Sequence, residues 1–170
     1  MAIDAFSARE AERILRAWRT CNRVTIYLVE GLPPELWPLA IPGSPRRSIR
    51  SVCAHLHNCR CMWIKTAGKR DGLRSPASVH RDTVTQSACC RALEQSGRAI
   101  ERLLAATLER AGNVGGFGLD AEHFLAYHAA HEGHHRGQIC LVARQLGHRL
   151  PADIQHGLWQ WSRRSKEAAR

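Results

Sequence analysis

The sequence predicts an all-α fold, an up-down-type four-helix bundle with a short extra helix near the C-terminus. Four long runs carry apolar residues three and four positions apart, a spacing that gathers them on one face of a helix. Proline- and glycine-rich stretches separate the runs. No stretch of useful length shows the alternation of apolar and polar residues that indicates a strand. A chain of 170 residues has the size of one ordinary domain, so we expect a single domain over residues 1–170.

Recognisable boundary residues support three of the four long helices. Gly31 and Pro33 end the first helix, because proline cannot continue the hydrogen-bond ladder. Ser48 and Asp120 have side chains suited to cap the second and fourth helices, and Gly147 suits the left-handed position that follows a helix. The expected helices cover residues 8–30, 49–67, 83–111 and 120–147.

The segments between and after these helices have their own signals. Residues 34–45 contain four prolines and predict a loop, with at most a short turn inside it. Pro151 opens the last segment, in which Asp153 is a candidate cap for a short fifth helix. We expect Trp159 and Trp161 to pack against the bundle rather than to wall a pocket, because tryptophan buries a large area.

The chain is strongly basic, with 25 Lys and Arg against 15 Asp and Glu and a formal net charge of +10. Such a field attracts anions, among them nucleic acids and acidic metabolites. The densest basic runs, residues 46–50 and 163–164, are short, and aromatic residues are not interleaved with them as they are in single-strand binders. We therefore expect the charges to be spread over solvated helix faces, and we do not expect nucleic acid as a partner.

Cysteine usage and hydropathy bear on the compartment. The seven cysteines show no Cys-x-x-Cys spacing, which favours reduced thiols over a disulfide framework. The first ten residues lack the apolar core of a signal peptide, and no stretch approaches the roughly 18 consecutive apolar residues of a membrane span. We expect a cytoplasmic protein with no membrane partner.

Five histidines lie within thirteen residues of the expected fourth helix, on or beside its apolar stripe. Positions four apart in a helix differ by only about 40° around the axis, so His131 and His135 project side by side. That spacing lets one helix offer two imidazoles to one metal ion. Other pairings remain open, because His128 and His134 lie three residues from His131 and His123 lies near the helix start.

A structural role for these histidines is the alternative. A lone histidine on an apolar face is usually a core residue with a hydrogen-bonded neighbour. Each buried imidazole needs partners for two ring nitrogens, however, and an unsatisfied group costs roughly 1 to 3 kcal/mol. Two histidines in register are less easily satisfied in that way, so the pattern favours metal binding.

A third ligand is expected from the second helix. His55 lies on its inward side beside Leu56, whereas His57 is rotated about 160° from the centre of that stripe and is expected in solvent. Cys59, one turn after His55, is a candidate fourth ligand or a thiol next to the site. A buried, unreactive thiol is the commoner outcome for such a cysteine.

The combined pattern resembles the DinB/YfiT-like superfamily of four-helix bundles. Its first half is a histidine soon after a Ser-Ile-Arg helix opening, here Ser48 to His55, and its second half is His-Glu-x-x-His-Arg-Gly-Gln-Ile, here His131 to Ile139. The resemblance covers nearly the whole chain. It implies a divalent metal ion held by His55, His131 and His135, commonly in a homodimer.

The resemblance also suggests a chemistry. Characterised relatives include thiol-dependent S-transferases and a mycothiol-dependent isomerase, so it implies a metal-dependent enzyme that activates a small-molecule thiol towards an electrophilic substrate. Zn is the first expectation for the metal, with Ni, Fe or Mn as alternatives, because imidazole ligands suit several of these ions. Arg136 is a candidate for binding carboxylates of the thiol, although a structural salt bridge is an equal reading.

Two other functions stay open. The segment from His131 to His135 reads H-E-x-x-H, the zinc-peptidase signature in which Glu132 would be the general base, so a small-molecule metal-dependent hydrolase is an alternative. The longer metzincin pattern fails, since Gln138 and Leu141 stand where its glycine and third histidine belong. Glu132 as a neighbour of the site or as a surface residue is the plainer interpretation. A non-enzymatic, metal-stabilised binding module with a basic surface is the other alternative.

Two glycines inside the histidine helix need an explanation. Gly133 and Gly137 lie four apart, and each costs about 1 kcal/mol relative to alanine in a helix interior. We expect a close approach of another helix there, in the bundle or in a dimer.

Overall fold

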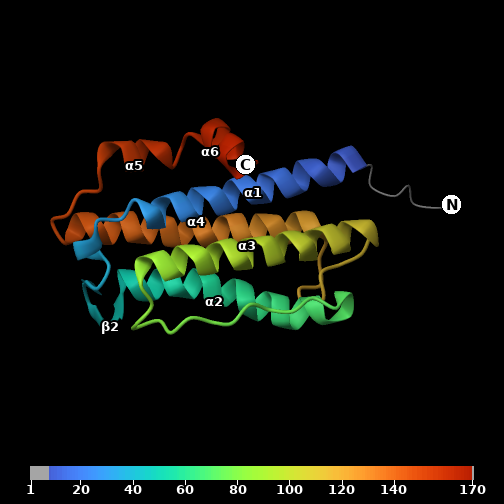
Figure 1. Ribbon diagram of the computed structural model, residues 1–170, viewed down its shortest axis with the longest axis horizontal. Coiled ribbons are helices and arrows are strands. Elements are labelled where there is room, and N and C mark those ends of the chain that lie inside the picture. The colour runs from blue at the N-terminus through green and yellow to red at the C-terminus, as the bar shows by residue number, and fades with distance from the viewer. Residues whose placement is uncertain (1–7, 170) are drawn as a thin grey trace.

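Four long helices packed side by side form the protein, as the computed structural model shows for residues 8–169 (Figure 1). They are α1 (Ala8–Glu30), α2 (Ile49–Ala67), α3 (Gln86–Glu109) and α4 (Ala121–Gln145). The prediction of an all-α four-helix bundle is confirmed. Residues 1–7, on which the expectation about a signal peptide partly rests, lie outside the described residues. Within residues 8–169, no helix combines the length and apolar character that crossing a membrane requires.

The helix ends follow the capping chemistry of the sequence. The Ser48 side chain accepts a hydrogen bond from the Ser51 backbone N–H at the start of α2, and Asp120 accepts one from His123 at the start of α4. Gly147 has a φ of 79°, the left-handed conformation expected after a helix. The third helix begins at Gln86 rather than near residue 83, because Thr85 caps it.

A short hairpin occupies part of the segment that was expected to be a loop. Strand β1 (Ala40–Ile41) pairs antiparallel with β2 (Ser44–Ser48), after a single turn of 3₁₀ helix, η1 (Pro34–Leu36). Gly43 makes the connecting turn with a φ of 73°. Two strands this short carry no readable alternation, which is why the sequence pattern missed them.

The C-terminal segment forms two short helices where one was expected. They are α5 (Ala152–Gly157) and α6 (Trp161–Ala168), and α6 packs against α1 (Figure 1). Pro151, and not Asp153, precedes the first of them. The expected packing of the two tryptophans is wrong, since Trp159 is 83% exposed and Trp161 is 41% exposed.

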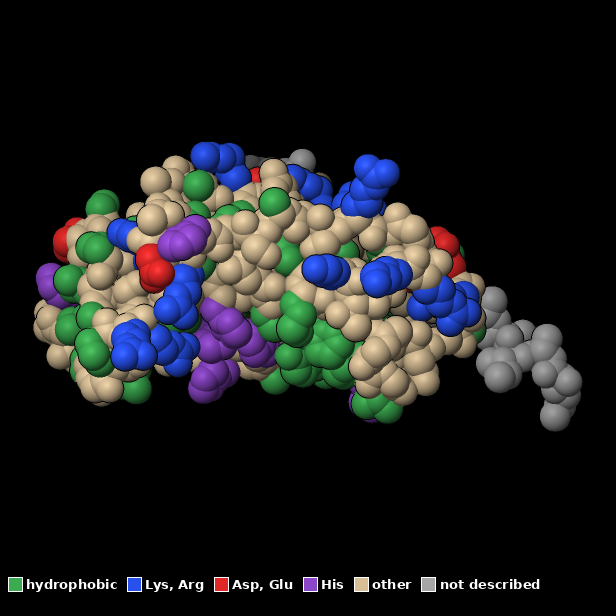
Figure 2. All heavy atoms as spheres, turned by 90° about the horizontal axis from the view of Figure 1, so that it is seen from below, with side chains coloured by type: hydrophobic (Ala, Val, Ile, Leu, Met, Phe, Trp, Pro, Cys, Tyr) green, Lys and Arg blue, Asp and Glu red, His purple; other side chains and the backbone are tan. Residues whose placement is uncertain are grey.

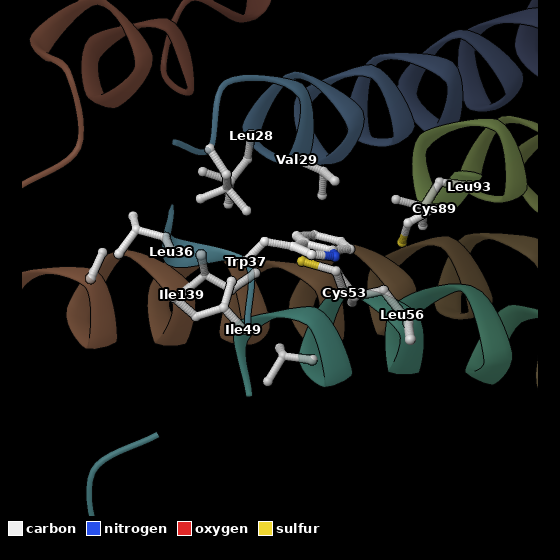
Figure 3. Packing of buried hydrophobic residues seen from close by; sticks show 14 of the residues in the cluster. Leu28, Val29, Leu36, Trp37, Ile49, Cys53, Leu56, Cys89, Leu93 and Ile139 are labelled. Atoms are coloured by element: carbon white, nitrogen blue, oxygen red, sulfur yellow. The ribbon is translucent and has the colours of Figure 1, made fainter. Parts of the chain in front are cut away.

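The core consists of two apolar clusters at opposite ends of the bundle. One cluster joins residues of all four long helices with the segment before α2, including Leu28, Trp37, Ile49 and Ile139 (Figure 3). The other is built around Trp18, and it draws on positions 64–67 of α2 and the first turn of α4. The residues of α2 and α4 between the clusters include buried polar side chains, and the candidate site lies at this level. All seven cysteines are free.

Candidate metal centre

Three histidines from two helices meet on one side of the bundle. His55 comes from α2, while His131 and His135 come from successive turns of α4. One ring nitrogen of each lies within 4.8 Å of the others, and the Nε2 atoms of His55 and His131 are 3.3 Å apart. The structure therefore brings together the three residues predicted as ligands. We refer to them as the histidine trio.

The donor set of the trio fits a divalent metal ion. Tetrahedral Zn with Zn–N bonds of about 2.0–2.1 Å requires nitrogens about 3.3–3.4 Å apart. The nitrogens of His55 and His131 already have that separation, at 3.3 Å. A metal ion held by the trio would accept one lone pair from each of the three rings. A hydrogen bond between two of the rings would satisfy only one donor and one acceptor.

The rings of the trio are held in the form that binds a metal. Burial lowers the pKa of all three imidazoles, that of His135 to about 4, and the positive charge of Arg47 lowers the pKa of His55 further. Neutral imidazole, and not imidazolium, is the ligand form. Burial increases across the trio from His55, which is exposed, through His131 to His135, so the site opens to solvent on the α2 side.

Neighbouring side chains fix two of the rings. Nδ1 of His135 is 3.0 Å from Oε1 of Gln138. When Nδ1 donates to that oxygen, Nε2 keeps the lone pair that a metal ion needs. The Tyr127 ring lies nearly parallel to that of His131, with centroids 5.8 Å apart. Ligand orientation thus depends on two residues of α4 itself, one turn from the histidines.

Glu132 points into the bundle and not towards the trio. Its carboxylate is fully buried and forms an ion pair with Arg60 of α2, with Nη2 and Oε1 2.7 Å apart. The Thr25 hydroxyl donates a second short hydrogen bond, 2.6 Å, to Oε2. Burial would raise the pKa of Glu132, but the Arg60 guanidinium holds that pKa below its ordinary value. The alternative that Glu132 is a surface residue is wrong. Glu132 follows His131 directly, and one residue along a helix rotates the side chain by about 100°, here towards the core.

Arg60 is a functional candidate that the sequence analysis missed. It is 1% exposed and also donates to Asn22 Oδ1 and to the Leu93 carbonyl, so it connects α2 with the other three long helices. A signal was present, because Arg60 lies four residues after Leu56 on the buried stripe of α2. A charged residue on such a stripe requires a buried partner of opposite charge.

The other histidines of α4 do not join the trio, although the His134 ring packs edge-on against that of His135, with centroids 4.9 Å apart. His128 is 1% exposed and packs edge-on against the rings of Trp18 and Phe124. Neither of its ring nitrogens has a hydrogen-bond partner within the described part of the chain, and burial lowers its pKa to about 3. His134 and His123 are exposed. These positions favour the i, i+4 pair over the other pairings.

His57 is buried, contrary to the expectation that it faces solvent. Its Nε2 lies 2.9 Å from the Ala77 carbonyl oxygen and 3.3 Å from Cys61 Sγ. The connection between α2 and α3 runs along this face of α2 and covers it (Figure 1). Helical periodicity cannot foresee such a cover, because the connection has no periodicity of its own.

Cys59 is half-buried and lies beside Tyr127, outside the group formed by the trio. Burial raises the pKa of its thiol, and a hydrogen bond with Tyr127 partly opposes that change. A thiol with a raised pKa is a poor ligand and a poor nucleophile. The structure therefore favours the unreactive alternative for Cys59.

Arg136 and the two glycines face away from the trio. Arg136 donates to Thr25 Oγ1 at 2.8 Å and lies 3.9 Å from Glu132, which is the structural salt bridge that was one of its two expected roles. A Cβ added at Gly137 would meet nothing within 4 Å, and one at Gly133 would meet only the Arg136 guanidinium. The expected close approach within the bundle is wrong for the described residues, and the dimer contact stays a prediction.

Comparison with known proteins bears on the whole chain. The DinB family model matches residues 7–163, a range that includes the histidine trio and the whole of all four long helices. No curated protein and no solved structure matches the chain.

Proposed function

The chain belongs to the DinB family, and from that premise we propose that it is a metal-dependent enzyme that transfers a low-molecular-weight thiol to an electrophilic substrate. The convergence of His55, His131 and His135 carries this proposal. Three protein ligands leave at least one coordination position free, which is typical of catalytic rather than structural metal sites. A divalent ion held there would act as a Lewis acid and stabilise the thiolate form of a bound thiol.

The protein's own residues divide the work of such a site. The trio, kept neutral by burial, would hold the ion, and Gln138 would orient His135 through its 3.0 Å contact. The exposed side at His55 gives a small molecule access to the free position. In the overall reaction the S–H bond breaks, a bond forms between sulfur and the electrophile, and the leaving group departs with the proton going to solvent.

Glu132 distinguishes this proposal from the hydrolase alternative. A zinc-peptidase-type mechanism needs that carboxylate beside the metal-bound water as a general base. Here the Arg60 guanidinium donates to both carboxylate oxygens, Thr25 donates a further hydrogen bond to Oε2, and the group has no exposed surface. The contacts of Glu132 therefore support a structural role for the glutamate of the H-E-x-x-H motif in this chain.

Thiol consumption tests the proposal. Metal-loaded protein is incubated with cysteine or glutathione and an alkylating electrophile, and the loss of free thiol is followed over time. We expect a rate above that of buffer containing free metal, and loss of that rate in His55→Ala, His131→Ala and His135→Ala. His123→Ala, which removes an exposed histidine near the start of the same helix, is the matched control and should keep the wild-type rate. Equal rates in wild type and the three trio variants would contradict the proposal.

A further inference from the structure

A pocket of about 270 Å³ adjoins the histidine trio on the α2 side. Its lining consists of Arg47, Ser51, His55, Asn58 and Arg81. His55 belongs both to the trio and to this lining, so one small molecule can reach the metal position and the pocket together. Two of the five lining residues are arginines, and none is acidic.

The side-chain polar groups of Ser51 and Asn58 already form hydrogen bonds within the protein. Ser51 forms the capping box with Ser48, and both ends of the Asn58 amide bond the backbone of Val79. These bonds anchor the pocket wall and leave few donors for a ligand. The pocket therefore offers a ligand mainly its two guanidinium groups.

The two arginines are available to an incoming anion. Within residues 8–169 no carboxylate forms an ion pair with Arg47, which is exposed on β2. Nε of Arg81 lies 3.5 Å from Oδ2 of Asp82. Both side chains are more than half exposed, so this ion pair is weak. Arg50 donates to the Asp82 carbonyl and so ties the segment that carries Arg81 to the start of α2.

The surroundings of the trio are asymmetric. Figure 2 shows the surface histidines between a group of Lys and Arg side chains on one side and an apolar patch on the other. Tyr127 stacks on His131, and Trp63 and Phe117 pack against Tyr127 edge-on or tilted. Met62, the residue before Trp63, is 52% exposed. An anion finds guanidinium groups on the arginine side, while the aromatic side suits apolar groups.

We propose that the Arg47–Arg81 pocket binds a carboxylate of the thiol substrate, so that the substrate class is small thiols with an acid group rather than neutral thiols. This inference rests on the proposed function. The sulfur would lie at the free metal position beside His55 and the carboxylate between the two guanidinium groups. Arginine is well suited to that role, because its planar fork donates two parallel hydrogen bonds to a carboxylate.

Binding of two matched thiols tests the inference without any turnover. Mercaptopropionate and mercaptopropanol differ only in the acid group, and cobalt-substituted protein reports sulfur binding through a sulfur-to-cobalt absorption band. We expect the wild type to bind mercaptopropionate more tightly, and Arg47→Gln and Arg81→Gln each to weaken that binding by about five- to tenfold at low salt. Neither variant should change mercaptopropanol binding. Arg74→Gln removes an exposed arginine of the same connection outside the pocket and should bind both thiols as the wild type does.

The outcomes separate this inference from the proposed function. A band with both thiols that is insensitive to Arg47 and Arg81 would overturn the pocket assignment and leave thiol binding at the metal intact. An equal loss of both thiols in the arginine variants would also overturn it, since that result points to a structural defect. No band with either thiol, in protein shown to contain cobalt, would overturn the proposed function and this inference with it.

Discussion

Replacing Glu132 with glutamine should destabilise the protein strongly, because it leaves the buried Arg60 charge without its counterion. Glu132 is fully buried, Arg60 is 1% exposed, and their closest atoms are 2.7 Å apart. Removing one partner of a buried ion pair costs about 3–5 kcal/mol, against a total stability of about 5–15 kcal/mol for a domain. With an m-value of about 2 kcal/mol per M in urea, the unfolding midpoint falls by about 1.5–2.5 M.

Equilibrium urea unfolding, followed by far-UV circular dichroism, measures this change. Glu94→Gln, an exposed glutamate on α3, is the control and should shift the free energy of unfolding by less than about 0.5 kcal/mol. The double variant Arg60→Met with Glu132→Gln removes the stranded charge and should recover part of the loss. A Glu132→Gln variant within about 1 kcal/mol of the wild type would refute the reasoning, since it would mean that the pair is hydrated or replaceable.

The same pair predicts a dependence on pH. The folded pKa of Glu132 lies below its ordinary value of 4.5, so the unfolded state binds the proton more readily. Its contribution to stability is therefore present above pH of about 4.5 and is lost as the pH falls through the folded value. Glu132→Gln lacks this step, so its stability should fall less steeply than that of the wild type in that acidic range.

Three further substitutions test other parts of the structure. His128→Phe should leave stability at pH 7 unchanged or slightly higher, since both buried ring nitrogens of His128 lack hydrogen-bond partners. Between pH 6.5 and about 3 only the unfolded state binds the proton on His128, so the substitution should reduce the pH slope of stability there by up to about 1.4 kcal/mol per unit. An unchanged slope in urea unfolding would contradict this. Gly137→Ala should stabilise α4 by about 0.5–1 kcal/mol, because a Cβ there meets nothing, and a lower thermal midpoint would instead point to a partner at this face. Gln138→Leu should weaken metal binding by about tenfold or more through loss of the His135 contact, measured by competition with a chelator, with unchanged helicity.

The parts of the fold that follow helical periodicity could be predicted from the sequence. The bundle, the caps at Ser48 and Asp120 and the meeting of His131 with His135 depend only on local spacing and capping chemistry. The placement of His55 opposite them depends on which faces of α2 and α4 are apolar. These signals lie within single helices, and the sequence contains them in full.

The remaining features depend on contacts between distant segments. His57 is buried because the connection after α2 returns along that helix and offers the Ala77 carbonyl. The Arg60–Glu132 pair joins residues 72 positions apart, and the buried stripe of α2 indicates that Arg60 needs a partner without indicating which residue supplies it. Trp159 is exposed because the C-terminal segment breaks into two helices, which turns its indole outwards. Single-helix patterns contain none of this information.

Metal content tests the central claim most directly. Mass spectrometry on untagged protein should find about one divalent ion per chain in the wild type and in the His123→Ala control, since the trio makes one site. His55→Ala, His131→Ala and His135→Ala should each lose the ion while the helical circular dichroism persists. A wild type that takes up no ion after incubation with Zn or Ni, or trio variants that retain it, would contradict the assignment of the metal centre.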